Sequence, residues 1–160
     1  MNRKTEADNK HLSKSEFYTL SWTWGILMTL IGAIVVGSIM LYGLITKKPY
    51  TLKKHGWCYY LNVGKMWGGL ELGMFFLTDS KDSITTKWHE HGHAIQNCYW
   101  GLLMPFVICI PSAIRYWYRE LKYNRKGLKC PTTYDSIWFE GEASSLGRKY
   151  KKLFKDEIIK

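Results

Sequence analysis

The longest hydrophobic stretch of the chain carries no charged residue from Phe17 to Thr46. Between Leu20 and Ile45 most positions are Ile, Leu, Val, Met, Ala or Gly, so no polar face forms at helical spacing. A helix over those residues would be about 39 Å long and could cross the roughly 30 Å hydrocarbon core of a bilayer with some tilt. A small domain can hardly bury a helix that is apolar on every side, so the pattern predicts a transmembrane helix over residues 17–46.

Polar residues on either side of this stretch divide the rest of the chain. Residues 1–16 show no apolar periodicity and are expected to form a polar N-terminal tail, and residues 47–160 to form one domain with a basic C-terminal tail. The apolar stretch is longer than the apolar region of a cleaved signal peptide, which favours a retained anchor. Lysines follow the stretch more closely than basic residues precede it, so the positive-inside rule predicts a single-pass membrane protein with a cytoplasmic C-terminal domain.

Two short runs after Pro49 are typical of β-strands. Residues 57–63 are rich in aromatic side chains and residues 70–77 are mostly apolar, with glycines between the two runs. We expect them to pair as a β-hairpin that turns near Gly64. Such a strand could lie over the helix that follows it and pair with an extended substrate, although a simple core hairpin fits the same pattern.

The second half of the chain has mainly helical patterns. Residues 83–100 should form a helix, with Ser83 or Thr85 as its N-terminal cap. A second charge-free stretch, residues 94–114, contains two prolines, which disfavour a straight second membrane span. We favour a hydrophobic segment that covers the preceding helix or dips into the headgroup region. Residues 114–122 should continue as a helix whose basic and aromatic residues are typical of a membrane interface.

Composition narrows the classes of partner. The chain has 160 residues, a formal net charge of +10 and 16% aromatic residues. A basic, aromatic-rich chain can suit nucleic acid, but the long apolar stretch makes the lipid bilayer the expected partner, and no nucleic-acid-binding motif occurs. The four cysteines form no CxxC pair, so neither a zinc knuckle nor a thioredoxin-type site is predicted, and we expect free thiols.

Three of the five histidines lie in one pentapeptide with the pattern HExxH. His89 and His93 are four residues apart, an advance of about 400° along a helix, so both imidazoles leave the same face and could hold one zinc ion. Glu90 lies about 100° further round, beside such an ion, where its carboxylate could take a proton from an activated water. His91 lies on the opposite face and is not expected to bind metal. HExxH is the minimal sequence pattern of a zinc metallopeptidase.

A zinc site with two histidines needs a third protein ligand and an open position for water. No histidine follows His93, and His55 upstream lies in a basic loop beside the apolar stretch, which disfavours it, so the downstream acids are the main candidates. On a helix that would begin near Pro131, Glu140 lies on a stripe of small residues, whereas Glu142 lies on the far side. The stripe consists of Ser136, Ala143, Ser144 and Gly147. Small residues let two helices approach closely, so we predict Glu140 as the third ligand. Asp135 is the alternative, either as a ligand or as a carboxylate that accepts an imidazole N–H.

Two further polar residues could act beside the metal. Gln96 lies on the same helix face as His89, where its amide could orient a ligand or bind substrate, although an ordinary polar helix residue fits equally well. Tyr134 could donate a hydrogen bond to an oxyanion.

The combination of HExxH with a downstream helical glutamate resembles the gluzincin branch of the zincin metallopeptidases. A longer pattern over roughly residues 56–150 resembles small, uncharacterised membrane-anchored zincin-like proteins of bacteria and phages. Its positions are His89, Glu90, Gly92, His93, Gln96, Pro111, Ser112, Tyr134, Asp135, Trp138, Glu140 and Ala143. The resemblance implies that His89, His93 and Glu140 bind Zn²⁺ and that Glu90 is the general base. The chain lacks most of the second subdomain of larger gluzincins.

We therefore expect an α+β protein, in which an N-terminal transmembrane helix precedes a compact, mainly helical zincin-like domain with a small β-hairpin or sheet. The expected function is that of a membrane-anchored, zinc-dependent metallopeptidase acting on a peptide or membrane-protein substrate. The alternative is a catalytically inactive, zinc-binding membrane adaptor or phage-type membrane factor. Substitution of Glu90 separates the two hypotheses, because only an enzyme would lose activity while keeping its metal.

Overall fold

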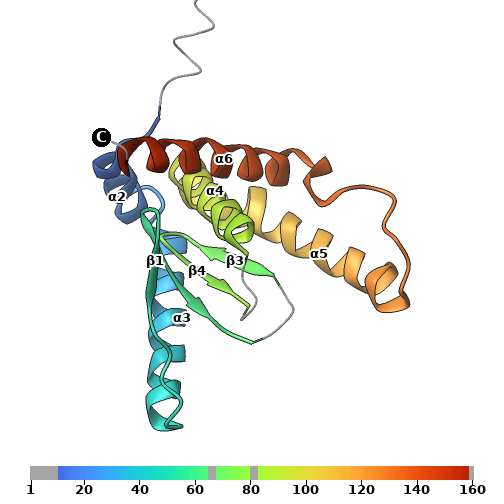
Figure 1. Cartoon of the computed structure of the whole chain (residues 1–160), viewed down its shortest axis with the longest axis horizontal. Coiled ribbons are helices and arrows are strands. Elements are labelled where there is room, and N and C mark those ends of the chain that lie inside the picture. The colour runs from blue at the N-terminus through green and yellow to red at the C-terminus, as the bar shows by residue number, and fades with distance from the viewer. Residues whose placement is uncertain (1–10, 65–67, 80–82, 159–160) are drawn as a thin grey trace, which may run out of the picture.

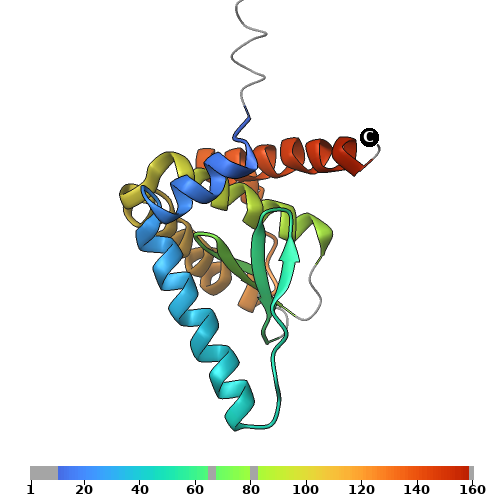
Figure 2. The same cartoon turned by 90° about the vertical axis from the view of Figure 1, so that its left-hand side faces the viewer.

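The computed structural model describes residues 11–64, 68–79 and 83–158 and shows an α+β fold, as expected (Figure 1). Helices α4 and α6 form two layers above a small mixed sheet, with α4 next to the sheet and α6 outside it (Figures 1 and 2). The elements in chain order are α2 (Lys14–Trp22), α3 (Ile26–Ile45), β1 (Lys53–His55), β2 (Cys58–Asn62), β3 (Gly69–Leu72), β4 (Phe75–Thr78), α4 (Ile84–Trp100), a 3₁₀ turn η1 (Gly101–Leu103), a π-helix η2 (Pro105–Cys109), α5 (Ile110–Lys122), the 3₁₀ turns η3 (Asn124–Lys126) and η4 (Tyr134–Ser136), and α6 (Trp138–Ile158).

The charge-free stretch 17–46 forms two helices, so the prediction of a single helix was wrong. The first helix, α2, begins within the predicted polar tail because Ser13 caps it. The Ser13 hydroxyl accepts the N–H of Glu16, and the Glu16 carboxylate accepts the N–H of Ser13, a reciprocal capping box. Phe17 then fixes α2 in the core, where its ring is fully buried. The first part of the apolar stretch therefore belongs to the folded domain.

The break between α2 and α3 lies at residues 23–25 and is held by the rest of the protein. Asn97 of α4 donates its side-chain N–H to the carbonyl oxygen of Gly25 at 3.2 Å. Trp24 donates its ring N–H to the backbone carbonyl of Tyr99, also at 3.2 Å. Contacts from α4 that come from much later in the sequence thus end α2, which local periodicity cannot indicate.

In the part of the chain that the structure describes, α3 is the one helix long and apolar enough by itself to cross a membrane. It has 20 residues, and 28% of its most apolar 18-residue segment is buried inside the protein. The sheet covers one side, where Gly32 lets Leu72 and Phe75 approach the helix backbone. Away from the sheet the helix is open, and Ile34 and Ile45 are 68% and 72% exposed. The candidate span is therefore shorter than predicted and partly covered by the domain.

The second charge-free stretch, residues 94–114, bends sharply. The helices on either side of residue 104 are inclined at 115°, so this region could form a second span only as a bent pair. Gly101 ends α4 with a φ of 53°, which favours glycine. Pro105 and Pro111 stand at the starts of η2 and α5, where a missing backbone N–H costs little. The expectation that this stretch is not a straight span agrees with the structure.

The sheet has the strand order β1-β2-β4-β3. The predicted hairpin between residues 57–63 and 70–77 was wrong: β2 pairs with β4 in parallel, with Tyr59 opposite Phe75. The 70–77 run is itself a hairpin, because Gly73 adopts a φ of 71° and turns the chain between β3 and β4. This arrangement places β3 at the edge of the sheet and in contact with α4.

The final helix begins later than expected. The residues near Pro131 do not start it; a 3₁₀ turn over Tyr134–Ser136 and an extended residue at Ile137 precede its first residue, Trp138. Glu140 therefore lies in the first turn of α6. All four cysteines are free thiols, as expected.

Candidate metal centre

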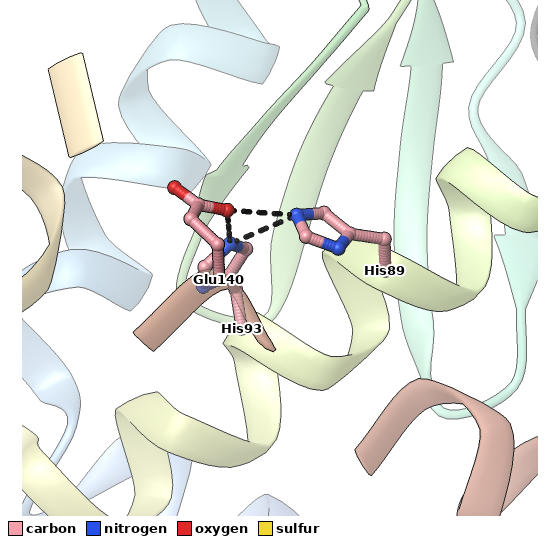
Figure 3. Close-up of side chains that lie close together, drawn as sticks. All are labelled: His89, His93 and Glu140. Carbon is pink, nitrogen blue, oxygen red and sulfur yellow. Dashed lines mark hydrogen bonds and ion pairs between the residues drawn. The ribbon is translucent and has the colours of Figure 1, made fainter. Parts of the chain in front are cut away.

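The HExxH residues lie on α4, in the middle of the fold. The predicted helix and one of its two candidate caps are confirmed: the Ser83 hydroxyl accepts the N–H of Thr86 at 3.0 Å. His89 and His93 leave the helix on the same side, and their ring centroids are 4.8 Å apart. Both rings turn their Nε2 atoms toward Glu140 (Figure 3).

Helix α6 carries Glu140 to this place because small residues line the contact between the two helices. A side chain at Gly92 would clash with the backbone carbonyl of Ala143, and one at Gly147 would clash with that of Trp88. The prediction that the small stripe faces α4 is thus confirmed for its members on α6. Ser136 precedes the helix, and its hydroxyl instead accepts a hydrogen bond from Arg115.

Three donor atoms converge at the centre. His89 Nε2 lies 3.1 Å from Glu140 Oε2, His93 Nε2 lies 3.2 Å from the same oxygen, and the two Nε2 atoms are 3.2 Å apart (Figure 3). Ligands held tetrahedrally at about 2.0–2.1 Å from a zinc ion lie about 3.3–3.4 Å from one another. The observed separations come close to those of a tetrahedral zinc site. Among the described residues, this trio is the group of His, Cys, Asp and Glu that could hold a metal ion.

The tautomer of His93 follows from the hydrogen bonds of Gln96. The amide nitrogen of Gln96 donates to the carbonyl of Phe139 at 2.9 Å and to the carboxylate of Glu142 at 2.7 Å, which fixes the orientation of the amide. Its oxygen, which can only accept, therefore faces His93 Nδ1 at 2.7 Å, so that nitrogen carries the proton. Nε2 of a neutral His93 then has a lone pair for a metal. Gln96 is thus buried against His93, the position that its interpretation as a ligand-orienting residue requires.

His89 is held by a different partner. Its Nδ1 lies 2.9 Å from the hydroxyl of Ser144 on α6. Burial lowers the pKa of His89, but the hydrogen bond to Glu140 and the negative charges of Glu90 and Glu140 outweigh it, so the pKa is raised. The site therefore favours positive charge at its centre, whether from a proton or from a metal ion.

Glu140 is fully buried. Burial raises the pKa of its carboxyl, but the hydrogen bonds with His89 and His93 outweigh this effect and hold the pKa far below its usual range. Ser112 of α5 donates a hydrogen bond to Oε1, the oxygen that does not face the histidines. The carboxylate is thus ionised and oriented, with Oε2 directed at the centre.

Glu90 lies beside the centre, between α4 and the edge strand. It is 5% exposed, and any side chain at Gly69 of β3 would clash with its carboxylate. Burial raises the pKa of Glu90 against the opposing influence of the two ligand histidines. A carboxylate whose pKa lies above its usual value takes up a proton more readily, which suits a general base.

A second buried carboxyl, Glu71, lies on β3 behind Glu90. It is 6% exposed, and burial raises its pKa well above the usual value. One of its oxygens accepts the backbone N–H of Gly73, and the other has no hydrogen-bond partner among the described residues. Burial thus favours the neutral form of Glu71, which adds no negative charge next to Glu90.

A cavity of about 680 Å³ opens over these residues. Gly68 and Gly69, at the start of β3, form part of its wall, and α5 lines it with residues that include Ser112, Tyr116 and Trp117. The edge strand β3 thus packs on the HExxH helix, as expected, and borders the cavity, while its pairing with a substrate stays a prediction.

Tyr134 and Asp135 also line this cavity, but the phenol of Tyr134 is largely buried and Asp135 is exposed. The Tyr134 ring centroid lies 6.3 Å from that of His89, and burial, aided by the charge of Glu140, raises the pKa of the phenol to about 12, so it remains a hydrogen-bond donor. Asp135 is exposed on the 3₁₀ turn and makes no hydrogen bond to either imidazole within the described ranges. Ser144 and Gln96, and not Asp135, make the hydrogen bonds to the Nδ1 atoms of the two histidines.

Sequence reasoning missed the roles of two serines. Ser144 was placed on the small-residue stripe, about 40° from Glu140, and that position was the available indication that it faces α4. Ser112 comes from α5, and no local spacing relates it to Glu140. It occurred only within the longer pattern that resembles zincin-like proteins.

Comparison with known proteins does not assign the chain to a family. No protein-family model matches the sequence, and neither curated proteins nor solved structures give a significant match. The resemblance to zincins therefore depends on the HExxH helix and on Glu140.

Proposed function

We propose that the protein is a membrane-anchored zinc metallopeptidase with a zincin-like domain. The observation that supports this most directly is the convergence of His89 Nε2, His93 Nε2 and Glu140 Oε2 at tetrahedral ligand spacing beside a buried glutamate. Two imidazoles and a carboxylate are the ligand set of catalytic zinc sites, in which a fourth position stays open. The apolar helix α3 supports anchoring in a bilayer.

Each residue has a defined part in peptide hydrolysis. Bound zinc supplies Lewis acidity, which makes water nucleophilic near neutral pH. The Glu90 carboxylate takes the proton of the attacking water and passes it to the leaving amine. The Tyr134 hydroxyl donates to the carbonyl oxygen as negative charge develops there. Ser144, Gln96 and Ser112 keep the three ligand side chains in place.

The outer edge of β3, which pairs with no other described strand, supports an extended peptide as substrate. Such a chain would pair with the strand next to Gly69 and bring one of its peptide bonds close to Glu90. The apolar residues of α5 on the facing wall would accept hydrophobic side chains.

The test compares wild type with Glu90→Gln, both as the full chain in phospholipid vesicles with zinc. Cleavage of a synthetic peptide library is followed by mass spectrometry, and zinc content by elemental analysis. Glu90→Gln should keep its zinc and lose cleavage by about 10²–10⁴-fold, the usual contribution of a general base. Glu120→Gln, on the outer part of α5, is the matched control and should cleave like wild type.

Two outcomes would contradict the proposal. If Glu90→Gln cleaves like wild type, Glu90 is not the base. If every variant binds zinc and none cleaves any peptide, the protein is the zinc-binding membrane adaptor instead.

A further inference from the structure

The segment from η1 through α5 carries an apolar stripe that no described part of the protein covers. No residue of α5 is buried. The stripe has members three or four positions apart, the spacing that keeps side chains on one face of a helix. They are Leu103, Phe106, Ile110, Ile114, Trp117 and Leu121, which are between 50% and 66% exposed. A continuous exposed apolar face of this kind marks a surface that binds a membrane or another protein.

This stripe adjoins the candidate membrane helix. The η1 turn packs against α3, and the ring of Trp24, just before α3, lies against Gly101. Figure 2 shows the segment around residues 101–109, in yellow, beside the upper part of α3. The exposed side of α3 near this end carries Leu30 and Ile31, 45% and 39% exposed. The two apolar surfaces are therefore neighbours.

The charges at the end of the stripe indicate that its partner is a bilayer. Residues 121–130 contain four basic residues and no acidic one. Lys122, Lys126 and Lys129 are all exposed there, and Trp117 and Tyr118 are more than half exposed next to them. Lysines attract anionic phospholipid headgroups, and tryptophan and tyrosine prefer the boundary between headgroups and hydrocarbon.

We propose that α5 lies in the surface of the bilayer, with the stripe in the hydrocarbon boundary and the basic residues at anionic headgroups. Ser112 and Tyr116 on the other side of the same helix line the metal cavity, and Trp117 of the stripe also lines it. The cavity therefore opens beside the membrane surface, and chains that lie on or emerge from the bilayer reach it directly. This inference concerns the surface of α5 and does not depend on whether the metal centre cleaves peptides.

The test places a photoreactive benzoylphenylalanine at Phe106 or at Ile114 in the full chain, reconstituted in vesicles of neutral and anionic phospholipid. Two matched sites serve as controls. Ile34 on α3 is 68% exposed and should report lipid if α3 spans the bilayer, and Ile84 at the start of α4 is 52% exposed but lies away from the stripe. After irradiation, mass spectrometry identifies what each site has bound.

The expected result is lipid adducts at residues 106 and 114 and none at 84. Lipid at 106 and 114 without lipid at 34 would keep the surface assignment and refute the span. Lipid at 34 alone would overturn the inference while keeping the anchor, and protein–protein crosslinks at 106 and 114 would overturn it in favour of a second copy of the chain. Absence of adducts at all sites would overturn both the inference and the anchor.

Discussion

The two faces of α4 carry histidines within one turn of each other and use them in different ways. On the face toward α6, the Nε2 atoms of His89 and His93 converge on a buried carboxylate. On the opposite face, His91 is fully buried among aromatic rings. Those rings belong to Phe17, Trp57, Trp88, Tyr150 and Phe154.

The surroundings of His91 exclude charge. Burial and the nearby His55 lower its pKa to about 3, so the ring stays neutral near neutral pH. The backbone N–H of Trp57 approaches its Nε2 at 3.5 Å, and that nitrogen can only accept in this arrangement. His89 faces Glu140 and not a cluster of aromatic rings, and the pKa of His89 is raised. The element packed against each face therefore decides whether a histidine is available to bind a metal or is a core residue.

Removal of the carboxylate from the ligand face should have the largest effect. We expect wild type to bind one zinc ion per chain and Glu140→Ala to lose stoichiometric zinc, because two imidazoles alone leave the site one ligand short. Glu120→Ala, on the outer part of α5, is the matched control and should keep its zinc. Elemental mass spectrometry of the purified proteins measures both, and a wild type that is folded but free of zinc would refute the metal centre.

The next largest effect should come from the hydroxyl that orients His89. Ser144→Ala removes the partner of its Nδ1 and should weaken zinc binding by about 10–100-fold, as is usual for groups that support a metal ligand. Ser145→Ala makes the same change at the exposed neighbouring position and should leave the affinity unaltered. Competition titration with a chromophoric chelator gives the two dissociation constants. Equal losses in both variants would show that Ser144 acts only through helix stability.

The smallest effect should appear on the aromatic face, as a pH dependence of stability. The folded-state pKa of His91, about 3, lies below the unfolded value of 6.5. Its contribution to stability is therefore fully present above pH 6.5 and is lost as the pH falls toward 3, with a slope of up to about 1.4 kcal/mol per pH unit. His91→Gln keeps a hydrogen-bond acceptor for Trp57 but cannot titrate, so its unfolding free energy should fall less between pH 6.5 and 4.5. Thermal unfolding followed by tryptophan fluorescence compares the two proteins, and parallel curves would contradict the assignment.

The same contrast separates what the sequence could predict from what it could not. The positions of His89, His93 and Gln96 around α4 follow from their spacing along the sequence. Once the start of the helix was predicted, all three could therefore be placed on the same face. Glu140 could be added because the small residues beside it define which side of α6 a second helix approaches. His91 could be excluded as a ligand by phase, but its aromatic partners come from α2, the β1–β2 turn and α6, and no local pattern joins them.

The sheet was predicted poorly for a related reason. Residues 57–63 and 70–77 have correct strand composition, but composition does not state which strands pair. The turn at Gly73 divides the second run, and the parallel pairing of β2 with β4 depends on β3 crossing to the edge first. Likewise, the break after Trp22 depends on Asn97 and Tyr99, which lie in a helix that forms far along the chain.

The order of the ligands along the chain has a consequence for synthesis. Glu140 comes 47 residues after His93, and both histidines come after α3. At a synthesis rate of about 5–20 residues per second, a growing chain carries the two histidines for several seconds before its third ligand has been made. During that interval the whole of α3 has already been made, while the nascent chain holds two of the three donors. If the protein is the metallopeptidase proposed above, its hydrolytic activity would begin only after α3 is available for insertion into a bilayer.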